Sequence, residues 1–76
     1  MENIREHLAD YLRESCSATE YDINESVLYH FMDSLDIIDM VMVIEKKYGI
    51  NVGEDWYEWG EATVDDIVKY IKEKIA

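Results

Sequence analysis

A single hydroxyl, that of Ser34, stands between carboxylates in the run Asp33-Ser34-Leu35-Asp36, directly before the longest apolar segment of the chain. A serine at this place either begins a helix as an ordinary residue or carries a phosphate-linked group. Unpaired backbone N–H groups and the positive end of the helix dipole would stabilise a phosphate bonded to the first turn. Asp33 and Asp36 oppose that stabilisation slightly, so we expect their role to be recognition by another protein.

Catalysis by Ser34 is the poorer interpretation. A serine nucleophile needs a histidine base within hydrogen-bond reach and an oxyanion hole. The nearest histidine, His30, stands four residues before the serine, and no Gly-rich turn surrounds Ser34.

The sequence also offers no metal site. A zinc site needs three or four ligands close together, whereas Cys16, His7 and His30 are far apart. Residues 22–33 lack the Gly and Glu that a calcium loop requires at its sixth and twelfth positions. We therefore expect a protein that is not an enzyme and holds no metal.

Composition narrows the choice of partners and location. The chain has 76 residues, with 18 acidic and 7 basic side chains and a net charge of -11, so it lacks the clustered Lys and Arg that nucleic-acid binding needs. A basic protein surface is the better partner, although solubility alone would explain the charge equally well, and the same charge favours a monomer. One cysteine and an N-terminus without a secretory signal predict a cytoplasmic protein. The longest apolar stretch, residues 37–44, is too short to span a membrane.

Hydrophobic periodicity predicts a first helix over residues 2–15, in which Ile4, Leu8 and Leu12 recur at helical spacing. A connection of some seventeen residues follows. So long a connection in a small domain needs apolar anchors. The candidates are Tyr21, Ile23, Val27, Leu28 and Phe31.

A second helix is predicted over residues 34–48, with Asp33 as its N-cap and Gly49 as the left-handed residue that ends it. Leu35, Ile38 and Met42 form its expected buried stripe, with Val41 and Ile44 as further candidates. Other positions make this helix apolar almost all round, so we expect more than one neighbour to cover it. They are Ile37, Met40 and Val43.

The last third of the chain predicts a short helix and a long one. Residues 50–52 read as an extended link, and residues 54–59 as a short helix that carries Trp56, Tyr57 and Trp59. Thr63 begins the final helix, with Asp66 completing a variant of the capping box. Its apolar face comprises Val64, Ile67, Val68, Ile71 and Ile75. No strand pattern competes, so residues 1–76 are predicted to form one all-α domain, an irregular four-helix bundle of three main helices and a short third one.

Three segments together resemble the acyl carrier protein family, the small four-helix bundles that carry a 4'-phosphopantetheine arm on the serine of an Asp-Ser-Leu motif. Residues 33–45 look like the family's second helix, residues 48–52 like the link after it, and residues 63–71 like its last helix. The likeness covers most of residues 33–76 in register. Phe31 stands where the family usually has Gly, and the approach to the serine is about two residues shorter than usual.

The resemblance implies a role for each matching residue. Ser34 would bear the arm, and Asp33, Leu35 and Asp36 would be recognised by the phosphopantetheinyl transferase that attaches it. Asp39 and Glu45 would belong to an acidic strip read by partner enzymes with basic docking surfaces, although a solvated helix face explains them equally well. Residues that would wall a pocket for an acyl chain, or simply pack in the core, are Leu35, Ile38, Met42, Val52, Ala62 and Ile67.

By this resemblance the chain is expected to be an acyl carrier protein. It would hold acyl intermediates as thioesters on its arm and present them to enzymes of fatty acid, polyketide or related synthesis. Two alternatives stay open. One is a peptidyl or aminoacyl carrier of the same fold, and the other is an acidic helical interaction module whose Ser34 is unmodified.

Overall fold

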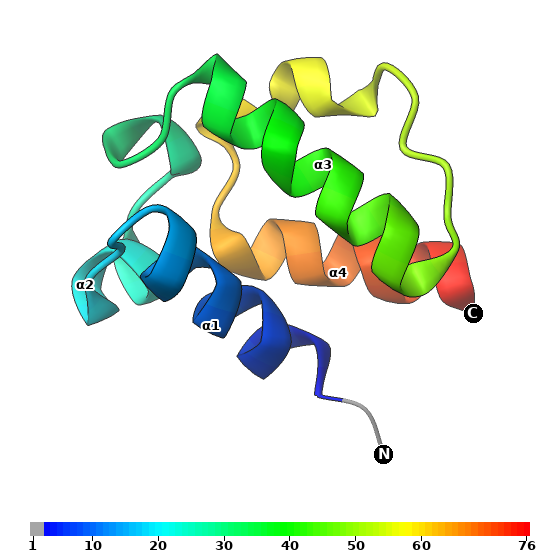
Figure 1. The fold of residues 1–76 in the computed structure, drawn as a ribbon, viewed down its shortest axis with the longest axis horizontal. Helices are drawn as coiled ribbons and strands as arrows, with labels where there is room; N and C mark the ends of the chain where they lie inside the picture. Colours follow the sequence, from blue (N-terminus) through cyan, green and yellow to red (C-terminus); the bar gives the residue numbers. More distant parts are fainter. Residues whose placement is uncertain (1–2) are drawn as a thin grey trace.

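The computed structural model describes residues 3–76, and all of its regular elements are helical (Figure 1). Within residues 3–76, β-type pairing is confined to one isolated bridge, between Val27 and Thr63. No helix in this part of the chain is long and apolar enough to cross a bilayer. The predicted all-α architecture is confirmed. The elements are α1 (Ile4–Ser15), α2 (Glu20–Glu25), the 3₁₀ helix η1 (Leu28–His30), α3 (Ser34–Tyr48), the 3₁₀ helix η2 (Asp55–Glu61) and α4 (Val64–Ile75).

The main helices begin and end where side chains satisfy their terminal backbone groups. The Asp33 carboxylate accepts a hydrogen bond from the Asp36 N–H at 2.9 Å, and the Thr63 hydroxyl accepts one from the Asp66 N–H at 3.2 Å. Gly49 ends α3 with a φ of 65°, in the left-handed region. The predicted cap, capping box and terminal glycine are all confirmed.

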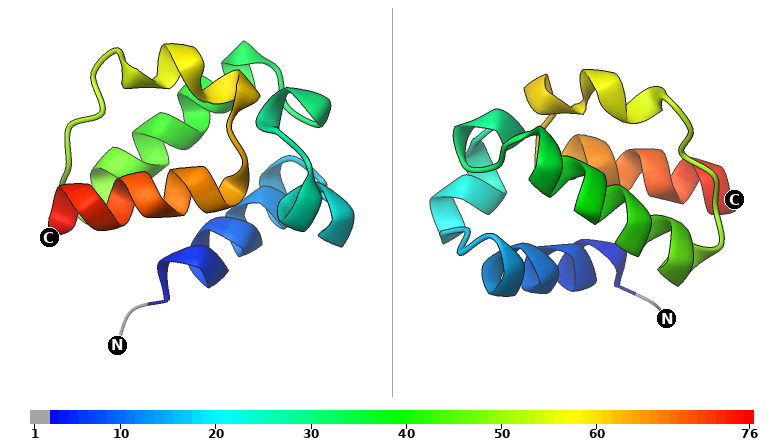
Figure 2. Two further views of the ribbon diagram at one scale, coloured as in Figure 1. Left: turned by 180° about the vertical axis from the view of Figure 1, so that it is seen from behind. Right: turned by 45° about the horizontal axis from the view of Figure 1, so that its top comes forward.

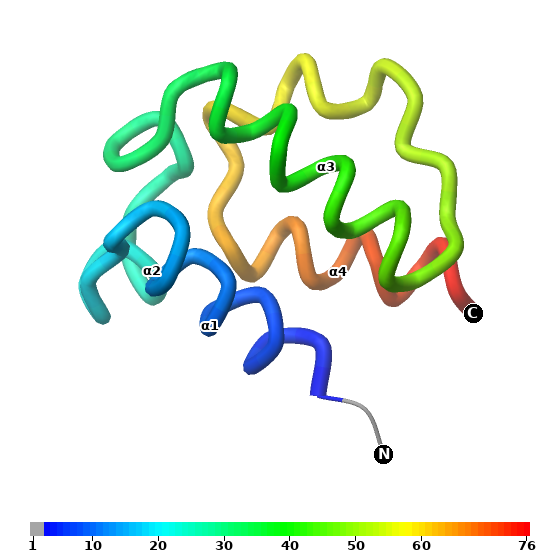
Figure 3. The backbone as a smooth tube through the Cα atoms, viewed as in Figure 1, coloured from blue at the N-terminus to red at the C-terminus, as the bar shows by residue number. Residues whose placement is uncertain are grey.

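The connection between α1 and α3 holds more structure than the sequence pattern predicts. Helix α1 ends at Ser15 as expected and begins at Ile4, while Glu2 lies outside the described residues. A reciprocal capping box between Thr19 and Asp22 starts α2, and η1 follows shortly before α3. Figure 3 shows the chain winding through these two short turns. Helix α2 has only six residues, which is too short for hydrophobic periodicity to reveal.

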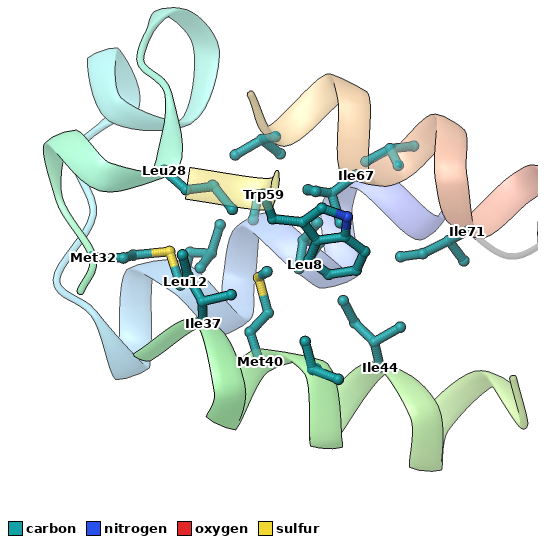
Figure 4. Packing of buried hydrophobic residues seen from close by; sticks show 14 of the residues in the cluster. Leu8, Leu12, Leu28, Met32, Ile37, Met40, Ile44, Trp59, Ile67 and Ile71 are labelled. Atoms are coloured by element: carbon teal, nitrogen blue, oxygen red, sulfur yellow. The ribbon is translucent and has the colours of Figure 1, made fainter. Parts of the chain in front are cut away.

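The main helices pack around one core (Figures 1 and 2). Helices α1 and α4 lie against each other, η2 packs on both α3 and η1, and α2 contacts α4. The buried side chains come from every element, and Figure 4 shows most of them meeting between α1, α3, α4 and η2. Those buried to within 2% exposure include Leu12, Ile23, Leu28, Ile37, Met40, Ile44, Val64, Ile67 and Ile71.

The buried face of α3 is not the one expected from its apolar stripe. Leu35 and Met42 are 69% and 57% exposed, and Ile38 is half-buried. The core face comprises Ile37 and Met40 together with Val41 and Ile44, the two further candidates, which are buried as expected. The prediction was wrong for Leu35, Ile38 and Met42 because α3 is apolar almost all round, so periodicity alone does not select a face. The neighbouring elements cover one side only. Ile75, expected on the buried face of α4, is likewise 48% exposed in its last turn.

Two arginines of α1 hold the short helix α2 in place. The Arg13 guanidinium donates to both Glu20 oxygens, at 2.7 and 3.0 Å. The Arg5 guanidinium donates to Asn24 at 2.6 Å and to Asp65 of α4 at 2.8 Å. Each pair is exposed and contributes little stability alone. Together they orient the segment that leads toward α3.

Candidate functional site

Ser34 is the first residue of α3, and it is exposed. The turn around it is held by a reciprocal capping box, in which the Asp36 N–H donates to Asp33 and the Asp33 N–H donates to Asp36 at 3.2 Å. Among residues 3–76, no hydrogen bond uses the Ser34 hydroxyl or the backbone N–H groups of Ser34 and Leu35. The turn therefore presents a solvent-facing hydroxyl beside two available N–H donors at the positive end of a 15-residue helix.

The segment before Ser34 is anchored in the core. Leu28 is fully buried, and its N–H donates to the Ala62 carbonyl at 2.8 Å. The Met32 N–H donates back to the Leu28 carbonyl at 2.8 Å, and Met32 is itself buried. Phe31, at a position where the resemblance would place Gly, has a φ of -140° and packs half-buried on the core. This backbone conformation does not need glycine, so Phe31 adds an anchor without strain.

Tyr29 and Gly60 fasten this approach to η2. The Tyr29 ring lies so close to Gly60 that a Cβ atom added there would overlap the ring carbons. Gly60 is buried and its φ is ordinary, so space rather than backbone freedom is what requires glycine. Close packing of η1 on η2 thus helps to set where α3 begins.

Negative charge is concentrated at the start of α3. Burial raises the pKa of the Cys16 thiol, and the nearby Asp36, Asp33 and Asp39 carboxylates raise it further. Burial likewise raises the pKa of Tyr11, with Cys16 and Asp39 adding to the effect. The thiol stays protonated at neutral pH and is a poor nucleophile. Within residues 3–76, no three His, Cys, Asp or Glu side chains gather in a way that could hold a metal ion.

The expected acidic strip divides into two parts. Asp39 is exposed on α3. Glu45 is half-buried, and one of its oxygens accepts the Val52 N–H at 2.9 Å, which fastens the link after α3 back onto the helix. Glu45 therefore has a role in the fold that the sequence does not reveal, because its partner lies seven residues away across a helix end.

The candidate pocket residues differ in their surroundings within residues 3–76. Val52 and Ile67 are buried in the core at 2% and 1% exposure. Ala62 and Ile67 line an open groove of about 640 Å³ between η2 and α4, whose lining includes neither Ile38 nor Met42. The aromatic residues of this groove are Trp59 and Tyr70. The sequence places both on helices, but nothing in it signals that they meet.

A search against protein families matches residues 2–71 to the phosphopantetheine attachment site family. The chain belongs to this family. Acyl carrier proteins from Rickettsia massiliae (strain Mtu5) and Rickettsia prowazekii (strain Madrid E) are each 46% identical over 46 residues, which cover 55% of this chain and 48% of the relative. The acyl carrier protein of Cylindrotheca sp. (strain N1) is 46% identical over 43 residues, covering 57% and 52%. The chain thus spans about half the length of the curated relatives it matches. No solved structure gives a significant match.

Membership of the phosphopantetheine attachment site family implies a covalently bound 4'-phosphopantetheine group. The first turn of α3 fits such a group, because the N–H groups of Ser34 and Leu35 have no hydrogen-bond partner within the described residues and could stabilise a phosphodiester on the Ser34 hydroxyl. The capping carboxylates already accept hydrogen bonds from the backbone, which leaves the turn formed before any phosphate arrives.

Proposed function

We propose that this chain is an acyl carrier protein whose 4'-phosphopantetheine is joined to the Oγ atom of Ser34. The observation that carries the proposal is an exposed serine hydroxyl on a preformed helix N-terminus, within a family of phosphopantetheine carriers. The terminal thiol of the bound group supplies the chemistry, holding an acyl group as a thioester. The chain itself positions that group and does not catalyse.

Attachment is a phosphoryl-group transfer from coenzyme A. The Ser34 Oγ–P bond forms as the P–O bond to the adenosine bisphosphate leaving group breaks, and the hydroxyl proton passes to a base of the transferase. On this chain, the N–H groups of Ser34 and Leu35 would stabilise the new phosphodiester. Asp33 and Asp36 would keep the first turn closed throughout.

We expect recognition by the transferase and by acyl-loading and acyl-processing enzymes to rest on α3 and its N-cap, where Asp33, Leu35 and Asp39 are exposed and Asp36 is half-buried. Leu35 is 69% exposed and offers an apolar contact, while Asp33, Asp36 and Asp39 offer charge to a basic surface. Glu45 contributes with the oxygen that does not bind Val52. Ile38 and Met42 would contact the acyl arm from outside the core. We expect a cytoplasmic monomer, since a net charge of -11 opposes self-association.

The attachment experiment uses coenzyme A, a broad-specificity phosphopantetheinyl transferase and intact-mass measurement. The wild type should gain the mass of one phosphopantetheinyl group and Ser34→Ala none. Ser17→Ala is the matched control, because Ser17 is another exposed serine, outside any helix, and this variant should be modified like the wild type. No mass gain by the wild type would refute the proposal in favour of an unmodified interaction module.

The kind of cargo is tested by competition. Acyl-activating and amino-acid-activating enzymes compete for the modified protein, and we expect acyl loading to dominate. Preferential aminoacyl loading would instead identify a peptidyl or aminoacyl carrier.

A further inference from the structure

Trp59 occupies the interior of the bundle. Its side chain is 6% exposed, and it belongs to the same buried cluster as Met40 and Ile44 of α3 and Ile67 and Ile71 of α4. Figure 4 shows its indole reaching from η2 in among these side chains. A large rigid aromatic therefore fills space between η2, α3 and α4.

Tyr70 of α4 holds Trp59 in place. Its ring meets that of Tyr70 edge to face, with centroids 5.2 Å apart. The Tyr70 hydroxyl donates to the Asp55 carboxylate at 2.6 Å, which ties α4 to the start of η2. Burial and this hydrogen bond raise the pKa of Tyr70 to about 12, so the hydroxyl remains a donor at neutral pH. Displacing the indole would disturb the ring pair and this closure together.

Neither the core around Trp59 nor the groove beside it offers an acyl chain an enclosed apolar site. On the core side, Val52 is 2% exposed, and Ile67, which also lines the groove, is 1% exposed. The groove beside Trp59 is open to solvent. Its lining combines Ala62, Ile67 and Tyr70 with five charged side chains, which are Asp55, Glu58, Asp66, Lys69 and Glu73. An alkyl chain gains little from an exposed, charged groove, because the hydrophobic effect needs apolar area removed from water.

We propose that Trp59 closes the bundle to the cargo, so that this carrier holds acyl groups outside its core and takes short or polar acyl chains rather than long alkyl chains. The inference rests on the proposed carrier function. It makes Trp59 a specificity-determining residue of that function.

The first test follows Trp59 directly. The chain has two tryptophans, so Trp56→Phe leaves Trp59 as the sole one. This variant is converted to the phosphopantetheinylated form and loaded with acetyl, hexanoyl or dodecanoyl groups. The Trp59 emission maximum, its indole N–H signal in NMR and the Tm should be the same for all three. A chain that entered the core would raise the Tm by roughly 3–6 °C per buried methylene, and such a rise with chain length would overturn the proposal.

The second test opens the core. Trp59→Ala should gain a Tm that rises with acyl-chain length, while Trp56→Ala, which alters the half-buried neighbour, should not. Trp59→Leu provides the same test with a smaller cavity if the alanine variant does not fold. Absence of any length dependence in the folded Trp59 variant would contradict the role given to this residue.

Intact mass is measured before each thermal melt to confirm that the protein is loaded. A chain that cannot be phosphopantetheinylated refutes the carrier function, whereas a loaded wild type with a length-dependent Tm refutes only the closure by Trp59.

Discussion

The close contact between Tyr29 and Gly60 predicts that Gly60→Ala destabilises the wild type but stabilises the Tyr29→Ala variant. A methyl group at position 60 overlaps the Tyr29 ring, so Gly60→Ala must push that ring away from η2. Tyr29 is 53% exposed, so its buried half corresponds to roughly 100 Å² of aromatic surface. At about 25 cal/mol per Å², losing this contact costs up to about 2.5 kcal/mol. Overpacking changes of this kind typically cost about 1–3 kcal/mol.

Removing the ring should reverse the effect. In the Tyr29→Ala background the three ring carbons nearest to the added methyl group are absent, and the φ of Gly60 lies outside the left-handed region. Gly to Ala at such a position stabilises by about 0.4–1 kcal/mol, because the unfolded chain loses conformational freedom. Gly60→Ala is therefore expected to lower the free energy of unfolding by about 2 kcal/mol in the wild type and to raise it slightly in Tyr29→Ala.

A double-mutant cycle measures this difference. Urea unfolding of the wild type, both single variants and the double variant is followed by circular dichroism at 222 nm, which avoids the neighbouring tryptophans. In the wild-type background the expected loss corresponds to roughly 8–16 °C in Tm. Equal destabilisation by Gly60→Ala in both backgrounds would show that the Tyr29 ring is not the obstacle, and would refute the packing argument.

Three further predictions concern the ends of the helices. Gly49→Ala should destabilise by about 1 kcal/mol in thermal melts, because its φ of 65° is unfavourable for a residue with a Cβ atom, and an unchanged Tm would contradict this. Asp33→Ala should cost about 1 kcal/mol through loss of the α3 cap, whereas Asp33→Asn should keep most of that stability, as urea titrations of both can check. The hydrogen bond from Arg13 lowers the pKa of Glu20, so the stabilisation by this pair is complete above the ordinary glutamate pKa and is lost as the pH falls through the lowered value. The stability advantage of the wild type over Glu20→Gln should accordingly shrink between about pH 6 and pH 3, and a constant difference would exclude this linkage.

The helix ends could be predicted from the local sequence, whereas the buried face of α3 and the bond of Glu45 depend on tertiary packing. The N-cap at Asp33, the box at Thr63 and the end at Gly49 depend on residues within one turn, so the sequence carries them. The buried face of α3 depends on where η2 and α1 lie, and an apolar helix does not reveal that. The same holds for Glu45, whose bond to Val52 crosses a helix end.

The candidate site shows the same division. Ser34 and its position at the start of a helix were predicted from the sequence, because the motif and the cap are local. The role of the candidate pocket residues could not be predicted from the sequence. Apolar residues such as Val52, Ala62 and Ile67 fit core packing and an acyl pocket equally well. The proposed closure by Trp59 would decide between the two, and the placement of Trp59 in the core depends on its contact with Tyr70 of α4.

The carboxylates of Asp33 and Asp36 stabilise the first turn of α3 in addition to any role in partner recognition. Asp33 and Asp36 close the first turn of α3 through each other's backbone N–H groups. Alanine at either position would therefore weaken the turn and remove a charge at once, so a slower attachment reaction would not distinguish the two causes. Asp33→Asn separates them, because the amide oxygen still caps the helix while the charge is gone. If the transferase reads charge at position 33, the Asn variant should be modified more slowly than the wild type at unchanged stability, and the difference should diminish as salt concentration rises. Equal rates would assign Asp33 to the fold alone and leave Asp36 and Asp39 as charges for recognition, of which Asp39 is exposed and takes no part in the capping box.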